Sequence, residues 1–349
     1  MRTRSPTTVA TACTCRTRGS SRRTAVSRWP ACRCGSSTEP NDHEVLTATQ
    51  HRFPARDVRT DVRRVLVALL LVAAVVPTAT AASPPLGLPP SFVLVRTGPD
   101  GGRIWEGSIP DRQVEDSRLS DVYLPPNFSP AVRYPVVIFL HGFWGSPSSF
   151  VHGLRLAETA DTEIEAGRAR PFIGVMPPGG PMTKTTSDEW AGVWEKYIVR
   201  DVVPWVDAHF LTDRNRRAIA GLSAGGYGAV DIGLRHPGLF RTLESWGGYF
   251  KPFLDGPFAH ASIADLRAHT PTLLVLRSAP ELRRLGTRFF RSTGMSGHGD
   301  VKARWTFEFA GELARLRMSH KLWVLPAKKR DHLFRTQLPA AIDYATPRS

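Results

Sequence analysis

The chain has 349 residues, four cysteines and a formal net charge of +15 at pH 7. Before residue 82 there are 13 Arg against 5 Asp or Glu, so the remainder carries only +7. In that remainder the basic residues are spread over predicted helices and loops, with no stripe of interleaved aromatic residues, which argues against a nucleic-acid-binding protein.

The first 57 residues are rich in Arg, Ser and Thr and show no sustained apolar period, which predicts a disordered leader. All the cysteines lie there, and no histidine or apolar residues support them as metal ligands. They are Cys13, Cys15, Cys32 and Cys34. We therefore expect no metal site and no other cofactor.

A secretory signal peptide is predicted over residues 58–81. Twelve apolar residues at 65–76 follow Arg63-Arg64 and precede Ala79-Thr80-Ala81, which is the order of a charged region, an apolar region and a cleavage site. Twelve residues are too few to span a bilayer. We expect a secreted or cell-envelope-associated mature chain that begins near Ala82 and has no stable membrane span.

This signal begins some sixty residues into the chain, which leaves two explanations open. Translation truly starts near Val58 or Val62, so that residues 1–57 are an over-extended gene model, or the charged region is unusually long. The predicted organisation then continues with a Pro-rich linker at 82–90 and one catalytic domain at 91–349.

Within that domain, short apolar runs alternate with helical patterns, which favours a doubly wound, mostly parallel sheet with helices on both faces. The predicted strands are 91–96, 103–108, 119–124, 134–140, 172–176, 218–220, 242–245, 287–293 and 321–325. The predicted helices are 150–166, 194–209, 224–234, 301–316 and 337–344. The stretch 253–286 is irregular and partly helical, and we expect it to overhang the site.

The most informative stretch is Gly221-Leu222-Ser223-Ala224-Gly225, a G-x-S-x-G motif between a predicted strand and a predicted helix. The two glycines allow a turn too tight for Cβ atoms, and the turn leaves Ser223 strained with its hydroxyl projecting. Helix N–H groups then face any oxyanion that forms there. The alternative is a glycine turn with a surface serine, but the flanking strand and helix supply the context that a nucleophile elbow requires.

An activated serine needs a base and an acid to orient that base, and this motif places them in the order Ser, acid, His. Of the eleven histidines, His332 alone follows the last predicted strand at the carboxyl edge of the sheet, where such sites lie. The alternative role for His332 is a surface loop residue. Asp300 is the predicted acid, although it could merely cap the next helix, and Glu281 is its substitute.

The oxyanion donors are expected to be the N–H groups of Ala224 and Phe143. We favour a structural role for His141, which begins the loop that carries Phe143. Four aromatic residues are candidates for lining the substrate pocket, although such residues are more often part of a core. They are Trp144, Trp190, Trp194 and Tyr227.

The residues resemble the esterase-D-like family of α/β hydrolases, which includes feruloyl esterases, enterochelin esterases and secreted mycolyltransferases. The resemblance covers roughly residues 115–345. Its matching stretches are Tyr134-Pro135-Val136-Val137, Leu140-His141-Gly142, residues 217–229, residues 236–240 and Leu338-Pro339-Ala340-Ala341. It implies the α/β-hydrolase fold, Ser223 as nucleophile, and Phe143 with Ala224 as oxyanion donors.

Two departures from the family pattern concern the acid and the base. The family usually has Pro-Gly-Gly-His after the last strand, whereas here Pro326 is followed by Ala327-Lys328-Lys329-Arg330-Asp331, so that His332 arrives three residues late. The family acid also tends to follow the strand's glycine more closely than Asp300 follows Gly294.

The sequence therefore predicts a secreted serine carboxylesterase that acts on a small-molecule or cell-envelope ester through an acyl-enzyme on Ser223. One alternative is an acyltransferase of the mycolyltransferase kind, in which a sugar hydroxyl replaces water. Another is a catalytically inactive binding protein that keeps only the fold. The acyl and alcohol parts of the ester and the oligomeric state are left open.

Overall fold

The computed structural model describes residues 83–114, 118–180, 189–294, 301–325 and 330–348, without the side chains of 330–332. All of them belong to one compact unit, residues 77–349. The predicted leader and signal peptide, and Asp300, lie outside the described residues.

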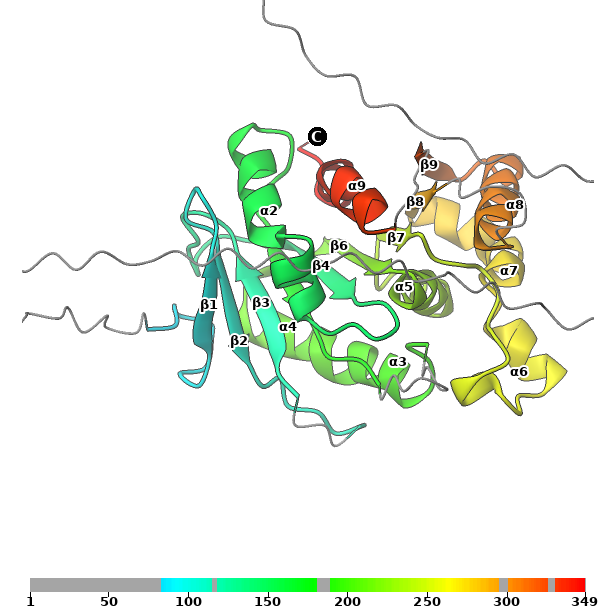
Figure 1. Cartoon of the computed structure of the whole chain (residues 1–349), viewed down its shortest axis with the longest axis horizontal. Helices are drawn as coiled ribbons and strands as arrows, with labels where there is room; N and C mark the ends of the chain where they lie inside the picture. Colours follow the sequence, from blue (N-terminus) through cyan, green and yellow to red (C-terminus); the bar gives the residue numbers. More distant parts are fainter. Residues whose placement is uncertain (1–82, 115–117, 181–188, 295–300, 326–329, 349) are drawn as a thin grey trace, which may run out of the picture. The chain divides into compact units, whose positions relative to one another are not determined.

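A nine-stranded sheet forms the centre of this unit (Figure 1), in the order β1-β2-β3-β5-β4-β6-β7-β8-β9. The first three strands pair antiparallel, β3 also pairs antiparallel with β5, and all later neighbours are parallel. The doubly wound, mostly parallel sheet predicted from the sequence is thus confirmed. The strands are β1 Val93–Thr97, β2 Arg103–Gly107, β3 Ser120–Leu124, β4 Tyr134–Leu140, β5 Ile173–Met176, β6 Thr212–Leu222, β7 Thr242–Trp246, β8 Arg288–Gly294 and β9 Ser319–Leu325.

Alternating side chains of the central strands face two separate hydrophobic layers. In β4, Val136 and Ile138 belong to one buried cluster, whereas Val137 and Phe139 belong to the other. A strand buried on both faces needs such a continuous apolar run, because successive side chains point in opposite directions.

Helices cover both layers (Figure 1). The first layer packs under α3 Val193–Tyr197, the π-helical turn η2 Ile198–Val202, α4 Val203–His209, α5 Ala224–Arg235, α7 Pro271–Arg284 and α8 Val301–Arg315. The second packs under α2 Leu156–Glu165 and α9 Arg330–Ala345. Within the part of the chain that the structure describes, no helix has both the length and the apolar character needed to cross a bilayer.

Several elements differ from the sequence-based expectations, among them β6, the helix predicted at 150–166 and the last helix. Strand β6 begins at Thr212, six residues before the predicted start, because its first half is a run of exposed and half-buried polar residues that hides the strand pattern. The predicted helix 150–166 is divided into the π-helical turn η1 Ser149–Gly153 and α2, since Arg155 between them adopts a left-handed conformation with φ of 58°.

The third difference concerns the last helix, which begins at Arg330 and not at Gln337. Leu333 and Gln337 are both buried, and their four-residue spacing continues the face formed by Leu338, Ala341 and Ile342. His332 was predicted to lie in a loop, and that prediction is wrong, because its backbone belongs to the first turn of α9.

Candidate active site

Ser223 occupies the turn between β6 and α5, in the middle of the parallel part of the sheet. Its backbone has φ of 49° and ψ of −110°, a region that non-glycine residues seldom adopt. The turn is secured on both sides, because the Ser223 N–H donates to the Trp246 carbonyl at 2.9 Å and its carbonyl accepts from the Tyr227 N–H at 3.1 Å. The strain predicted for a nucleophile elbow is therefore present at this serine.

The two glycines of the motif are required by close backbone approaches. A Cβ atom on Gly221 would lie 2.2 Å from the Gly225 carbonyl oxygen, and a Cβ on Gly225 would lie 2.0 Å from that of Leu140. Both separations are far below any van der Waals contact. Glycine at these positions lets the first turn of α5 pack directly against the ends of β4 and β6.

The loop after β4 packs against this turn. A Cβ on Gly142 would lie 3.1 Å from the Leu222 carbonyl oxygen and 3.4 Å from the Ser223 Cβ, so Phe143 follows at the edge of the serine. Ala224 begins α5, and its N–H is one of the four at a helix start that have no carbonyl partner within the helix. The two predicted oxyanion donors thus come from segments that meet at Ser223.

His141 anchors this loop from below. Its Nε2 accepts the Gly179 N–H at 2.9 Å, its Nδ1 lies 3.0 Å from the Gly142 carbonyl oxygen, and its side chain is buried. Burial is the main cause that lowers the pKa of His141 to about 4, so the ring stays neutral at pH 7. A neutral imidazole with both nitrogens engaged by the backbone holds the loop in place.

Two pockets meet at Ser223, and Phe143 and Lys302 line both of them. The larger has a volume of about 590 Å³ and extends over the loop after β4, with Trp144 and the α9 residues Phe334 and Arg335 in its wall. The smaller, of about 280 Å³, has both apolar and acidic walls. Its remaining lining residues are Glu189, Ala224, Tyr249, Phe253 and Asp255. An ester has an acyl part and an alcohol part on either side of the bond that is cleaved, and two pockets that meet at one serine can each hold one of them.

The predicted aromatic lining residues lie in different places. Trp144 is 64% exposed and lines the larger pocket. Trp190, Trp194 and Tyr227 are buried, and none of them is among the described residues that line the two pockets. The indole N–H of Trp190 donates to the His141 carbonyl at 3.0 Å, so this residue supports the loop from the core.

The predicted base, the predicted acid and its substitute come from separate segments of the chain. The backbone of His332 lies in the first turn of α9, two residues before the pocket residue Phe334, while its side chain lies outside the described residues. Asp300 also lies outside them. The substitute acid, Glu281, lies on α7 with its side chain 51% exposed and pairs with Arg284 at 3.8 Å. That pairing occupies it with a neighbour on its own helix.

Glu189 is a buried carboxyl group of the smaller pocket that sequence reasoning did not single out. The Tyr249 hydroxyl donates to its Oε1 at 2.9 Å. Burial first, and the nearby charge of Asp255 second, raise the pKa of Glu189 to about 8. The wall beside the serine therefore carries a protonated carboxyl group at neutral pH.

We expect Glu189→Gln to stabilise the protein at alkaline pH and to have little effect near pH 5. In the unfolded chain this carboxyl ionises near its ordinary pKa of 4.5, whereas in the folded protein it does so near 8. The protonated Glu189 therefore contributes its full share to the free energy of unfolding below pH 4.5. This share is lost as the pH rises towards 8, because the buried carboxyl group is then forced to ionise. Glutamine cannot ionise, and its side-chain oxygen can still accept a hydrogen bond from the Tyr249 hydroxyl.

The measurement is the difference between the thermal midpoints of the variant and the wild type from pH 5 to pH 9. Glu308→Gln is the matched control, because the Glu308 side chain is 47% exposed and lies on α8. A midpoint difference for Glu189→Gln that stays constant over this range would contradict the buried, protonated carboxyl.

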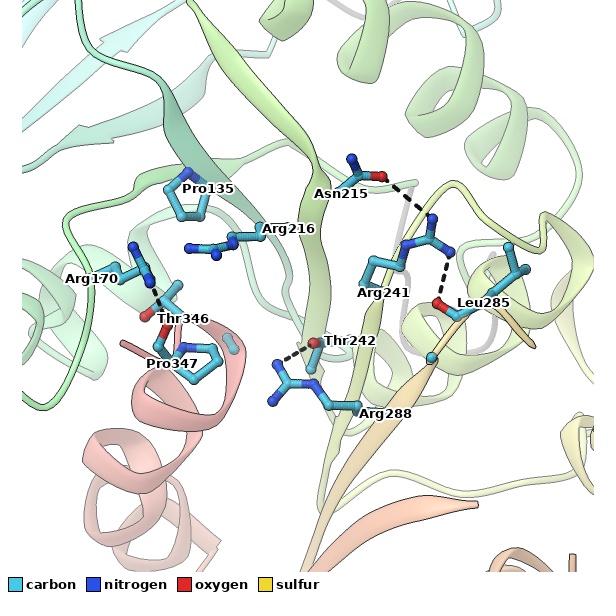
Figure 2. Close-up of a pocket in the computed structure, with 12 residues that line it drawn as sticks. Pro135, Arg170, Asn215, Arg216, Arg241, Thr242, Leu285, Arg288, Thr346 and Pro347 are labelled. Atoms are coloured by element: carbon cyan, nitrogen blue, oxygen red, sulfur yellow. Dashed lines mark hydrogen bonds between the residues drawn. The ribbon is translucent and has the colours of Figure 1, made fainter. Parts of the chain in front are cut away.

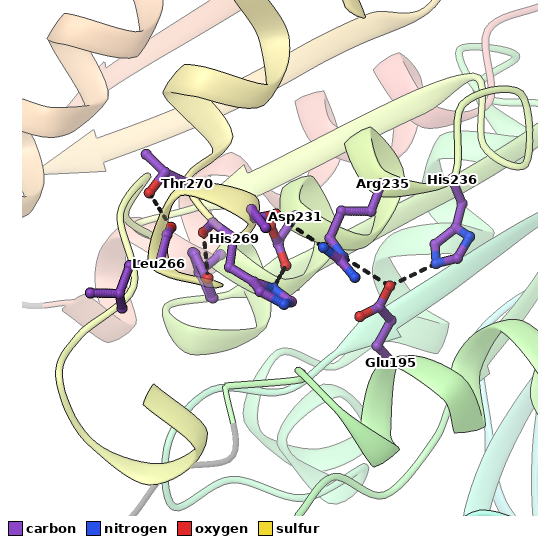
Figure 3. Close-up of polar contacts among 9 residues, drawn as sticks. Glu195, Asp231, Arg235, His236, Leu266, His269 and Thr270 are labelled. Atoms are coloured by element: carbon purple, nitrogen blue, oxygen red, sulfur yellow. Dashed lines mark hydrogen bonds and ion pairs between the residues drawn. The ribbon is translucent and has the colours of Figure 1, made fainter. Parts of the chain in front are cut away.

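A second polar cluster lies along α5, outside both pockets (Figure 3). The Nδ1 of His269 lies 2.8 Å from Asp231, and Glu195 accepts from Arg235 at 3.0 Å and lies 2.7 Å from the Nε2 of His236. These contacts hold the stretch before α7 and the helix α3 against α5. A His–carboxylate pair also supplies two of the three members of a catalytic triad, but this one does not reach the described lining of either pocket at Ser223.

No short motif marked the residues that complete the pocket walls. Glu189 precedes the buried Trp190, Lys302 is the second residue of α8, and Phe334 and Arg335 belong to the unpredicted first turns of α9. The nearest signal was the expectation that residues 253–286 overhang the site, and Phe253 and Asp255 of that stretch do line the smaller pocket.

Comparisons with known proteins agree with this geometry. Residues 113–325 match the family model Esterase, described as "Putative esterase". A protein of Xylanibacter ruminicola named endo-1,4-beta-xylanase/feruloyl esterase is 29% identical over 191 residues, which cover 51% of this chain and 25% of that protein. An esterase of Mycobacterium tuberculosis is 31% identical over 139 residues, which cover 37% of this chain and 28% of that protein. The matched regions thus span about a quarter of the length of these relatives.

Solved structures show the same fold. A ferulic acid esterase superimposes with a TM-score of 0.60 at 19% identity, covering 70% of this chain and 98% of its own. An S-formylglutathione hydrolase of Agrobacterium tumefaciens superimposes with a TM-score of 0.58 at 17% identity, and the match covers 72% of this chain and 98% of that one. The family model spans more than half of the sequence, and the fold and the serine elbow agree with it, so the chain belongs to this esterase family of α/β hydrolases.

Proposed function

We propose that this protein is a secreted serine carboxylesterase that cleaves a small-molecule or cell-envelope ester through an acyl-enzyme on Ser223. The observation that carries the proposal is the position of Ser223. It is strained, half-buried, placed at the start of α5 and shared by two pockets. This arrangement suits attack on a carbonyl carbon whose two substituents lie in different pockets.

The proposed mechanism has two steps. The Ser223 Oγ attacks the ester carbonyl while His332 takes its proton, and the N–H groups of Phe143 and Ala224 receive the charge that develops on the carbonyl oxygen. His332 then gives the proton to the leaving alcohol. A water molecule next attacks the acyl-enzyme while the same histidine takes its proton, and the histidine then gives this proton to the Ser223 Oγ as the acid leaves. Asp300 would hold the tautomer of the histidine.

A second candidate is an inactive binding protein that retains the fold. The observation that favours it is the placement of His332 in the first turn of α9, where a loop was expected. Both candidates keep the same pockets, so the two differ only in whether Ser223 is activated.

Covalent labelling by a fluorophosphonate probe separates the two candidates, because the probe reacts with activated serines. We expect the wild type to be labelled at Ser223. Absence of labelling in folded protein, under conditions that label a known serine hydrolase, would favour the binding protein. The mass of the labelled product from the culture medium or cell envelope tests export, which predicts a chain that begins near Ala82. Labelled product that still contains Cys13 would contradict signal cleavage.

A further inference from the structure

A separate pocket of about 360 Å³ (Figure 2) lies at the amino ends of the parallel strands, whereas Ser223 lies at their carboxyl ends. Residues at the amino ends of β4, β7 and β8 and in the first half of β6 line it, together with the end of α9 and the residues that follow. Arg216 in this pocket and Leu222 before the nucleophile belong to the same strand. At the rise of an extended strand they lie about 20 Å apart, so this pocket is distinct from the catalytic one.

Four arginines line the pocket, and no Asp or Glu is among its described lining residues. Arg170, Arg241 and Arg288 are half-buried, and Arg216 is exposed. Figure 2 shows the side chains of Arg170, Arg216 and Arg288 extending into the space between the strands and the C-terminal segment. Such a concentration of like charge is unfavourable unless an anion balances it.

The hydrogen bonds of the half-buried arginines go to neutral groups. Arg170 donates to the Pro347 carbonyl at 2.8 Å, and Arg241 to the Leu285 carbonyl at 2.9 Å. The Nη2 of Arg288 donates to the Thr242 hydroxyl at 3.0 Å and to the Tyr344 carbonyl at 2.9 Å. These contacts orient the guanidinium groups without an ion pair, and burial raises the pKa of the neighbouring Glu244, which interacts electrostatically with Arg288, to about 8, so that this carboxyl group is neutral at pH 7.

Within the described part of the chain, Asp213 is the carboxylate that forms an ion pair with one of these four arginines. It pairs with Arg216 at 3.5 Å, and both side chains are partly exposed, at 27% and 43%. A solvent-exposed pair at this distance contributes little. The local charge of the pocket therefore stays strongly positive.

We propose that this pocket binds a small soluble ligand with multivalent phosphate chemistry, such as a pyrophosphate or a phosphomonoester. Planar guanidinium groups donate paired hydrogen bonds to phosphate oxygens, which makes arginine the residue best suited to such anions. The volume exceeds that of a single inorganic phosphate, so a ligand with two phosphate groups or a phosphate on a larger body fills it better. Arg216 on β6 and Arg288 on β8 would reach the ligand from the strands on either side of β7.

Titration calorimetry with pyrophosphate tests the proposal, at an ionic strength held constant with NaCl so that general screening is the same throughout. We expect saturable binding of pyrophosphate by the wild type and weaker binding of orthophosphate. Arg216→Gln should weaken pyrophosphate binding about tenfold or more, because it removes a charge-assisted hydrogen-bond donor. Arg216 is the safest position to change, since it is exposed and its one contact with the described residues is the long ion pair with Asp213.

Arg315→Gln is the matched control, because Arg315 is an exposed arginine of α8 that pairs with Glu312 at 2.7 Å, away from the pocket. It should leave pyrophosphate binding unchanged. Arg241→Gln provides a second pocket variant with the same expected loss. Turnover at Ser223 should be unaffected in Arg216→Gln, so the result does not depend on the catalytic proposal.

Three outcomes would overturn the proposal. The first is no saturable pyrophosphate binding at constant ionic strength. The second is binding that Arg315→Gln weakens as much as Arg216→Gln does. The third is capture of the protein by phosphatidic acid vesicles without any binding of free pyrophosphate, which would assign the arginines to a membrane surface.

Discussion

Ser223→Ala is expected to lower kcat for a short-chain aryl ester by on the order of 10⁶, which is the scale of removing the nucleophile of a catalytic triad. The thermal midpoint should barely change. Alanine keeps the Cβ and the backbone conformation of the elbow, and the hydrogen bonds of this residue to Trp246 and Tyr227 are made by its backbone.

The measurements are initial rates with and without enzyme, and thermal unfolding of both proteins. Ser146→Ala is the matched control, because Ser146 is an exposed serine of the loop after β4 and does not belong to the lining of either pocket at Ser223. Its activity should equal that of the wild type. Retention of most of the turnover in Ser223→Ala would show that the hydrolysis takes place elsewhere.

The nucleophile elbow could be predicted from the sequence because its constraints are local. The clash at Gly221 is with the Gly225 carbonyl oxygen four residues later, and the motif itself spans one strand end, one turn and one helix start, whereas the clash at Gly225 is with Leu140 of β4. The continuous apolar run of β4 is local in the same way, since its two-sided burial requires every residue to be apolar. These features allowed the parallel sheet and the position of Ser223 to be predicted together.

The walls of the pockets could not be predicted, because long-range topology builds them. Glu189, Lys302 and Phe334 come from segments more than thirty residues apart in sequence, and they meet only when α8 and α9 pack on opposite faces of the same sheet. The start of β6 was missed for a different reason. Its polar first half lies at the edge that forms the arginine pocket, where charged side chains replace the apolar strand pattern.

Replacement of His332 tests the proposed base. His332→Ala should lose about as much kcat as Ser223→Ala, because the members of a triad act as a unit. The proposed role rests on the neighbours of His332 in the sequence. Phe334 lines the pocket that contains Ser223, and Leu333 and Phe334 lie 3.5 Å and 3.0 Å from the position of a Cβ on Gly247, which follows β7. The first turn of α9 therefore borders the site.

His260→Ala serves as the control for this variant, because His260 is exposed and lies outside both pockets. Asp300→Asn should lose less, on the order of 10⁴, since it disturbs the tautomer of the base without removing it. Fluorophosphonate labelling of His332→Ala should fall with turnover, which distinguishes loss of activation at Ser223 from loss of substrate binding.

The late position of His332 after the last strand defines the result that would contradict its role as the base. The family pattern Pro-Gly-Gly-His would place its histidine at Lys329 in this chain, three residues before His332. A base at position 332 can serve only if the first turn of α9 directs the His332 side chain towards Ser223. Should His332→Ala keep full turnover, the assigned base is wrong. Should the wild type lack turnover and gain it in Lys329→His, the natural protein keeps the pockets of an esterase without its base.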